Sequence, residues 1–569
     1  MVSPVGTLSK LAVGKDHPRY KWVALSNTTL GVLMSSINGS IVMISLPDIF
    51  RGIHLDPLEA GNTSYLLWMM MGFLLVTAVL VVTLGRLGDI YGRVRLYNLG
   101  FVVFTVGSIA LVACPASGGA GAMWLILCRV VQGIGGACLF ANSMAILTDA
   151  FPADRRGLAL GMNQVAGIGG SFIGLIVGGL LGPVDWHLIF GVSVPFGLLG
   201  TFWSYHSLHE IGARVQARID WLGNLLFGVG LAALLAAITY GIQPYGGSNM
   251  GWANPWVMTG LIAGVVLLVA FCVVETKVED PMFDMSLFKI RAFSAGNLAN
   301  LLSAIGRGGM QFMLIIWLQG IWLPLRGYNF EHTPLWAGIY MLPMTVAFLM
   351  FGPTSGYLSD RFGARTFATG GLTLVALSFV GMILIPTNFN YWAFAGLLFL
   401  SGIGSGMFAS PNSTAIMNSL PANRRGVGSG MRGTFFNAGT SLSIGVFFSM
   451  MIIGLADSLP HALTTGLTSH GVNQAVATGI GHAPPVGSLF AALLGYNPIS
   501  TMLTQAKVTA SDIGQGNWDA LTNKEFFPQL ISGPFHNGLV IVFTAAAVMT
   551  MIAAVASLFR GSRFINEES

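Results

Sequence analysis

Long apolar stretches alternate with short polar loops along nearly the whole chain, and glycine, proline and charged residues mark the loops. Each stretch is about 20 residues long, which is the length that a helix needs to cross roughly 30 Å of hydrocarbon. The pattern therefore predicts an all-α membrane protein with fourteen transmembrane helices. The predicted spans are 22–46, 64–84, 95–114, 122–149, 157–181, 187–208, 221–242, 255–275, 293–324, 334–355, 367–386, 391–419, 433–454 and 536–560.

Composition agrees with a bilayer as the main solvent. The chain has 569 residues, of which 54% are hydrophobic and 9% are charged, whereas roughly a quarter of the residues in a soluble domain are charged. The 75 glycines would weaken helices in water, but in a membrane they let helix backbones approach closely. We therefore expect a tightly packed helical bundle.

The basic residues are distributed unevenly between the two sides of the predicted membrane. If the N-terminus is cytoplasmic, 21 of the 27 Lys and Arg residues fall in cytoplasmic segments and only 4 on the opposite side. Such a bias predicts orientation, so both termini are expected in the cytoplasm. The first twenty residues lack a cleavage site of a secretory signal, so the first span is expected to anchor the chain itself. The basic residues form no patch of the kind that binds nucleic acid.

One cytoplasmic loop sequence occurs twice. GRLGDIYGR at 85–93 recurs in degraded form as GYLSDRFG at 356–363, each time between the second and third helices of a six-helix unit. We therefore predict two halves, residues 1–210 and 293–569, separated by two inserted spans and a cytoplasmic linker at 211–292. Substrate sites in such repeats lie at the midplane between the halves.

The segment at about 455–535 is the one long connection, and it is predicted to be extracytoplasmic. It is mildly apolar, so we expect a partly helical cap lying on the bundle or the membrane surface. A disordered loop is the alternative.

The repeated loop resembles the cytoplasmic signature of the major facilitator superfamily, G-x-L-a-D-r-x-G-r. The resemblance implies a conformational latch, in which Asp89 pairs with Arg93 or with a basic residue across the cytoplasmic gap. An ordinary charged turn between helices is the structural alternative. The latch residues are Gly85, Asp89, Gly92 and Arg93, with Asp360 and Arg361 in the second copy.

Two further motifs extend the resemblance. Span 4 contains RVVQGIG from Arg129, which is similar to the family's R-x-x-q-G-x-g and includes Gln132. An arginine within hydrocarbon costs a few kcal/mol, so Arg129 should face a polar cavity, or alternatively its head should reach the outer surface. Span 5 resembles the antiporter motif G-x-x-x-G-P-x-x-G-G, with Leu175 at the proline position. Its glycines are expected to pack against a helix of the other half, and they are Gly170, Gly174, Gly178 and Gly179.

Segments 281–288, 317–319 and 337–343 are similar to the fourteen-span drug:proton antiporter branch of the same family. The resemblance then covers about residues 30 to 455. It implies export of amphipathic or cationic compounds across a bacterial inner membrane, driven by inward proton flow.

The first span departs from that branch. Where the branch has an aspartate tied to proton coupling, this chain has Asn38, whose amide cannot titrate. None of the 22 acidic residues falls in the middle of a span. The remaining candidates for proton transfer are Asp48, which could couple to Arg129, and His187 or His536 near outer span ends.

Arg307 lies well inside span 9, where burying a cation in hydrocarbon costs free energy, so a specific role is expected for it. It could meet an anionic head group, a carbonyl cluster or a lipid phosphate, or it could be purely structural. The complete set of candidate substrate or coupling residues is Asn38, Ser40, Asp48, Arg129, Gln132, Arg307, Gln311 and Gln319.

The leading hypothesis is a secondary active transporter that exports amphipathic or hydrophobic compounds by alternating access, with proton antiport as its drive. A transporter of a lipid or an anionic metabolite with little or no proton coupling is the second hypothesis, and a non-transporting sensor is the third. No catalytic order, metal-ligand spacing or P-loop occurs, and the four cysteines show no ligand spacing. We therefore predict no enzyme activity, cofactor or metal, and leave a periplasmic adaptor protein open.

Overall fold

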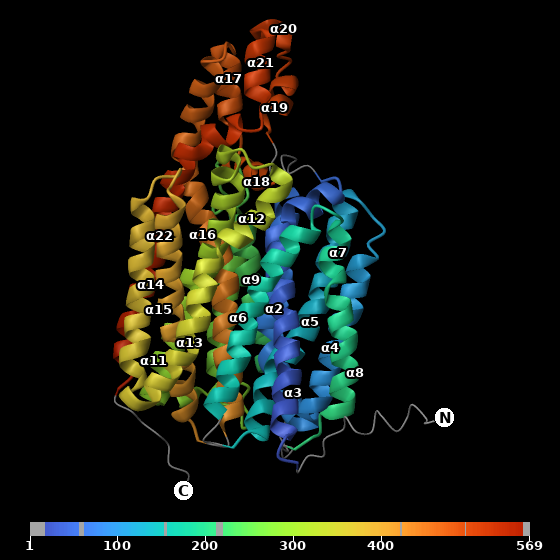
Figure 1. Ribbon diagram of the computed structural model, residues 1–569, viewed down its shortest axis with the longest axis vertical. Helices are drawn as coiled ribbons and strands as arrows, with labels where there is room; N and C mark the ends of the chain where they lie inside the picture. The colour runs from blue at the N-terminus through green and yellow to red at the C-terminus, as the bar shows by residue number, and fades with distance from the viewer. Residues whose placement is uncertain are drawn as a thin grey trace.

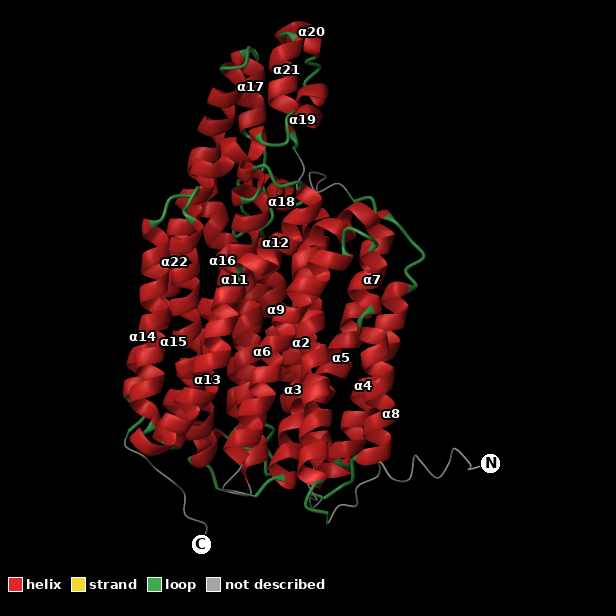
Figure 2. Ribbon diagram, in the orientation of Figure 1, coloured by secondary structure: helices red, strands yellow, loops and turns green. Residues whose placement is uncertain are grey.

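The computed structural model describes residues 17–55, 62–152, 156–211, 220–421, 424–494 and 497–561. These residues form helices joined by short connections, with no β-strand beyond one isolated bridge between Tyr245 and Ser248. Fourteen helical segments are long and apolar enough to cross a membrane. The prediction of an all-α membrane protein with fourteen spans is confirmed (Figure 2).

The helices of the first part of the chain are α2 (Tyr20–Gly52), α3 (Asn62–Tyr91), α4 (Arg93–Val112), α5 (Gly118–Ala150), α6 (Arg156–Leu181), α7 (Trp186–Gly191) and α8 (Ser193–Ser207). The pair α9 (Trp221–Gly241) and α10 (Pro255–Glu275) follows. Next come η2 (Met285–Lys289), α11 (Arg291–Trp317), the π-helical turn η3 (Leu318–Trp322), η4 (Pro324–Arg326), η5 (Phe330–His332), α12 (Thr333–Tyr340), α13 (Leu342–Phe362), α14 (Ala364–Leu384), α15 (Tyr391–Asn418), α16 (Arg425–Thr468) and, after several short helices, α22 (Phe526–Leu558).

Two groups of helices stand side by side in the bundle (Figure 1). In the first group α2 packs on α6, and both α3 and α4 pack on α5. In the second group α13 and α14 pack on α15, while α11, α16 and α22 pack on one another. The groups meet where α3 contacts α16 and where α6 contacts α12 and α13. Helices α9 and α10 pack on each other, and α9 also contacts α3 and α16.

The two copies of the repeated loop form tight turns at one end of the bundle, which we call the turn end. Gly92 separates α3 from α4 with φ of 117°, and Gly363 separates α13 from α14 with φ of 88°. Residues with a Cβ rarely adopt this backbone conformation. Glycine at these two positions therefore allows consecutive antiparallel helices to follow one another almost without a loop.

The opposite end carries a helical extension, and we call it the extension end. Helices α16 and α22 continue well past the predicted limits of 454 and 536. Together with α17 (Gln474–Gly481), α19 (Ile499–Gln505), α20 (Ala510–Ile513) and α21 (Gln515–Thr522) they project beyond the bundle (Figure 1). The predicted boundaries were wrong here because polar residues such as Asp457 lower the hydropathy without ending a helix.

One helix of this connection lies against the bundle instead of projecting from it. Every residue of α18 (Pro485–Leu493) is buried. Phe490 stacks on Phe448 of α16 with ring centroids 5.2 Å apart, and Gly320 of η3 lies against the Ala492 backbone. The expected helical cap is thus present, but it consists of one buried helix and a projecting group.

The glycines of span 5 bring α6 into close contact with α2. A Cβ on Gly170 would lie 2.8 Å from the Leu33 carbonyl oxygen, and a Cβ on Gly174 would lie 2.5 Å from that of Ile37. Gly178 likewise faces α2, so the predicted packing on the other half is wrong for these three residues. Gly179 alone faces the second group, at the backbone of Leu335. Consecutive positions on a helix face directions about 100° apart, so Gly178 can contact α2 while Gly179 contacts the second group.

Candidate transport site

Arg129 lies in the middle of α5 and is only 1% exposed. Its Nη1 donates to Asn38 Oδ1 and to Gln132 Oε1, the latter at 3.2 Å, and its Nε donates to the Met69 carbonyl oxygen at 3.4 Å. The guanidinium also lies 4.8 Å from the centre of the Phe73 ring. The side chain is therefore held inside the first group of helices, and the alternative in which it reaches the outer surface is wrong.

This polar network continues to two more helices. Gln132 Nε2 donates to Ser108 Oγ of α4 at 2.8 Å, and Asn38 Nδ2 donates to Ser193 Oγ of α8 at 3.4 Å. One buried network thus joins five helices of the first group, and amides rather than a carboxylate satisfy its arginine. Ser108 and Ser193 were not predicted, because small hydroxyl residues commonly bond the carbonyls of their own helix and give no sequence signal.

Ser40 and Asp48 lie on the same helix as Asn38 but outside the network. Ser40 Oγ donates to the carbonyl oxygens of Ser36 and Ile37. Asp48 Oδ1 accepts from Arg51 at 2.8 Å, while its buried Oδ2 has no partner. The predicted coupling of Asp48 to Arg129 is wrong, since a nearer arginine one helical turn along α2 takes its place.

Arg307 and Gln311 occupy one face of α11, four residues apart. Both side chains are half-buried, whereas the neighbouring Gly306 and Gly309 are buried against α22 and α16 respectively. In the part of the chain that the structure describes, neither side chain has a hydrogen-bond or ion-pair partner. The surroundings of Arg307 therefore differ from those of Arg129, whose charge is surrounded by hydrogen-bond acceptors.

Gln319 connects the two groups near the extension end. It is fully buried in η3, and its Nε2 donates to the Ile44 carbonyl oxygen of α2 at 3.3 Å. Together with Gly179 against Leu335, this bond closes the bundle at that end.

The turn end is closed by a second set of contacts. Gln164 of α6 donates to Ser413 of α15 at 3.4 Å, and Ser429 of α16 donates to the sulfur of Met144 of α5 at 3.2 Å. Arg432 of α16 also donates to the Met144 sulfur, at 3.7 Å. The two groups of helices therefore touch at both ends.

The latch residues form an ion-pair network within the first group. Arg93 donates to Asp89 Oδ1 at 2.8 Å and to both oxygens of Asp149 at 2.7 Å. The predicted pair of Asp89 with Arg93 is present, and no ion pair across the gap is seen for Asp89 among the described residues. Asp149 at the end of α5 was not predicted to take part, because only the packing of α4 on α5 brings it to Arg93.

The backbone glycines of the latch allow close approach. A Cβ on Gly88 would meet the Asn142 side chain of α5, and Gly85 lies near Ala141 of the same helix. In the second copy, the Arg361 guanidinium lies 5.0 Å from the centre of the Tyr357 ring. The Asp360 side chain lies outside what the structure describes.

The two histidines proposed for proton transfer lie away from the Arg129 network. His187 is bonded to Asp185, with Nδ1 2.7 Å from Oδ1, and its hydrogen bonds hold the pKa of Asp185 below its usual value. His536 lines a cavity of about 460 Å³ with His461 and Thr387, between α16, α22 and the connection from α14 to α15. Among the described residues, no hydrogen bond joins either histidine to the network.

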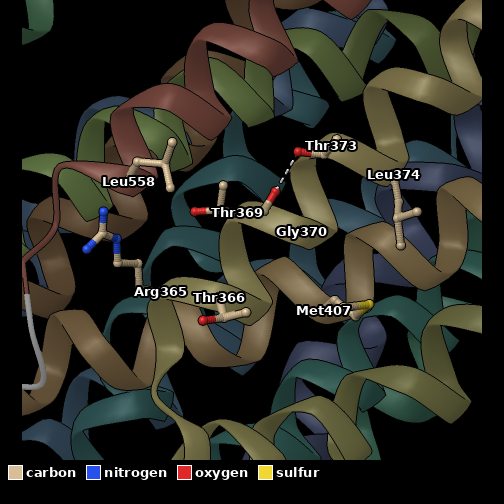
Figure 3. A pocket seen from close by; sticks show the side chains of 8 residues that line it. All are labelled: Arg365, Thr366, Thr369, Gly370, Thr373, Leu374, Met407 and Leu558. Atoms are coloured by element: carbon tan, nitrogen blue, oxygen red, sulfur yellow. Dashed lines mark hydrogen bonds between the residues drawn. The ribbon is translucent and has the colours of Figure 1, made fainter.

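A larger groove of about 710 Å³ lies outside the space between the groups (Figure 3). Helices α14, α15 and α22 alone line it. Its lining residues are Arg365, Thr366, Thr369, Gly370, Thr373, Leu374, Met407 and Leu558. Because no residue of the first group reaches it, it is separate from the candidate transport site.

The described residues contain no group of three His, Cys, Asp or Glu side chains that could hold a metal ion, and the four cysteines are unpaired. A bundle with fourteen candidate spans, in two groups of helices that touch at both ends, is the architecture of a membrane transporter of the facilitator type. Residues 28–210 and 213–444 match the model of the Major Facilitator Superfamily, and the chain belongs to this family. Members of this family are transporters and not enzymes.

Individual relatives agree with this assignment. The chain is 29% identical over 437 residues to the riboflavin transporter RibZ of Clostridioides difficile (strain 630), covering 76% of this chain and 88% of that protein. It is 30% identical over 448 residues to the multidrug resistance protein Stp of Mycobacterium tuberculosis (strain CDC 1551 / Oshkosh), covering 78% of each. The resemblance to the fourteen-span drug:proton antiporter branch is confirmed by the family match and such relatives.

A solved structure shares the fold. It is that of a bacterial homologue of the human lysosomal transporter Spinster, in an inward-facing and occupied conformation. The TM-score is 0.53 at 15% sequence identity, and the match covers 96% of this chain and 98% of that one.

Proposed function

We propose that this protein is a secondary active transporter that exports amphipathic or hydrophobic compounds by alternating access, with inward proton flow as the drive. Residues 1–210 and 293–569 would be the two moving halves, and residues 211–292 would add two helices beside them. The positive-inside bias supports a cytoplasmic turn end and cytoplasmic termini. The bacterial relatives support the inner membrane as its location.

The single observation that carries the substrate assignment is the contrast between the two embedded arginines. Arg129 has its acceptors inside the protein, so it supports the architecture of the first half. Arg307 has none among the described residues and keeps accessible surface. We therefore assign Arg307, with Gln311, to the substrate, where it would bind an anionic or electron-rich group.

This contrast also favours a second candidate function. A transporter of a lipid or an anionic metabolite would use the same arginine, and it would need no titratable group near the midplane. Asn38 cannot carry a proton, so proton coupling would depend on Asp48, whose Oδ2 is buried and unpaired. A periplasmic adaptor protein is a further candidate partner in either case.

Transport into proteoliposomes with an imposed pH gradient tests both candidates. The probes are one anionic and one cationic fluorescent dye of similar size, and the variants are wild type, Asp48→Asn and Arg307→Gln. We expect gradient-driven transport of the anionic dye, a strong loss of gradient dependence in Asp48→Asn and a loss of anionic-dye transport in Arg307→Gln.

A transport rate in the wild type that does not depend on the pH gradient would exclude proton antiport and leave the lipid or anionic-metabolite transporter as the function. Undiminished transport of the anionic dye by Arg307→Gln would exclude the assigned substrate contact.

A further inference from the structure

Two carboxyl groups meet at the turn end, where α9 begins and α10 ends. Asp220 caps the N-terminus of α9 through its Oδ1, which accepts from the Gly223 N–H at 2.8 Å. Glu275 is the last residue of α10 and only 2% exposed, and its Oε2 accepts from the Phe283 N–H at 2.9 Å. Each carboxyl group therefore has one oxygen satisfied by a backbone donor.

The remaining oxygen of each group is buried and has no donor. Asp220 Oδ2 and Glu275 Oε1 both lack a hydrogen-bond partner. Both oxygens border the position that a Cβ on Gly223 would occupy, so they are close neighbours in the structure. Two buried acceptors this close repel each other if both groups are ionised.

No cation compensates this repulsion in the part of the chain that the structure describes. Neither carboxyl group has an ion pair there. Among the described residues, the other titratable and charged groups near this pair are Arg86 on α3, Cys272 on α10, Lys277, Glu279, Asp280, Asp284 and Lys289 in the segment after α10, and Arg424 before α16. Arg214 and Arg218, which precede Asp220 in the sequence, lie outside the described residues. Arg86 pairs with Asp280 and Arg424 pairs with Asp284, so both of these cations are already engaged.

We propose that Asp220 and Glu275 form a proton-binding site in which one proton is shared between Oδ2 and Oε1. A proton held between these two oxygens would give each of them the hydrogen-bond partner that it otherwise lacks. This site depends neither on the identity of the substrate nor on proton antiport.

The site lies where a change in charge can reach the rest of the bundle. Asn224, one turn into α9, donates to the Asp220 carbonyl oxygen at 2.6 Å and accepts from Thr83 of α3. Arg86 of α3 lies 3.8 Å from Asp280. Loss of the shared proton places two negative charges in contact at the base of α9 and α10, and so weakens the attachment of these helices to α3 beside the latch.

Infrared difference spectroscopy of the purified full-length protein tests the site without any transport measurement. The signal is the carbonyl stretch of a protonated carboxylic acid, recorded near neutral pH and again at alkaline pH. We compare wild type with Asp220→Asn and Glu275→Gln, and with Glu279→Gln, which removes an exposed acid nearby. Asn keeps the helix cap and Gln keeps an acceptor for Phe283, so both variants retain their backbone bonds.

We expect the wild type and Glu279→Gln to show the same carboxylic-acid band, which disappears at alkaline pH. Asp220→Asn and Glu275→Gln should each lose one such group per chain, because a lone carboxyl group no longer needs the shared proton. Asp48, the other buried acid, contributes equally to all four spectra. A band of unchanged size in both variants, or a pair occupied by a metal cation and therefore without a band in the wild type, would overturn the proposal.

Discussion

At the scale of single residues, the two embedded arginines differ in what surrounds them. Arg129 is enclosed by acceptors from α2, α3 and α5, whereas Arg307 has no partner among the described residues. A charge that is bonded in the folded state contributes to stability, and its loss leaves unsatisfied groups behind. A charge without partners contributes little, so its presence inside a membrane protein requires a functional reason.

Replacing Asn38 by Ala should destabilise the protein by about 2 kcal/mol, because Arg129 Nη1 loses a charge-assisted bond in a buried site. Asn38→Asp should keep most of the stability, since a carboxylate oxygen accepts the same bond. The measurement is the free energy of unfolding in detergent, and equal stability of Asn38→Ala and wild type would contradict the described network.

Replacing Arg307 by Gln should change the free energy of unfolding by no more than about 0.5 kcal/mol, which is the range of substitutions that remove no contact. Transport of an anionic probe should fall at least tenfold in the same variant. Thermal unfolding and proteoliposome transport measured on one preparation check both parts, and a large loss of stability would show that Arg307 is structural.

At the scale of helices, close contact between α2 and α6 depends on glycines that have backbone directly opposite them. A Cβ on Gly174 would lie 2.5 Å from the Ile37 carbonyl oxygen, whereas a Cβ on Gly169 of the same helix would meet nothing within 4 Å. Helix association in a bilayer relies on such packing, because lipid already solvates apolar surface.

Gly174→Ala should therefore destabilise the protein by about 1–3 kcal/mol through overpacking, and it should lower the yield of folded protein. Gly169→Ala is the matched control, with the same change of residue on the same helix and no expected loss. Comparable thermal unfolding temperatures for the two variants would mean that α2 and α6 do not approach as described.

At the scale of the whole molecule, the two groups of helices touch at both ends. Alternating access requires that one set of these contacts opens while the other stays closed. The turn-end contacts of Met144 and Gln164 join the groups directly, while the Arg93 network holds α3, α4 and α5 together as one unit.

A cysteine pair at Met144 and Ser429, in a variant without the four native cysteines, should form a cross-link with a short bifunctional thiol reagent. Their side chains are 3.2 Å apart, and the link should block transport by holding the turn end closed. Single-cysteine variants treated in the same way should remain active. Full activity of the cross-linked protein would exclude opening at this end.

The sequence by itself determined the fourteen spans and the all-helical class, because a helix needs about 20 apolar residues to cross a bilayer. It also indicated the family, through the loop motif at 85–93 and its second copy at 356–363. It also indicated that Arg129 needs a polar partner, since an arginine in hydrocarbon is costly. Only the tertiary structure decided which partners are used. Asn38, Ser108 and Ser193 meet Arg129 or its neighbours, and Asp149 completes the latch, through distances between helices that no local pattern encodes. The tertiary structure also decided how far α16 extends. Beyond its apolar stretch this helix packs on neighbouring helices outside the bundle, and the membrane no longer stabilises it.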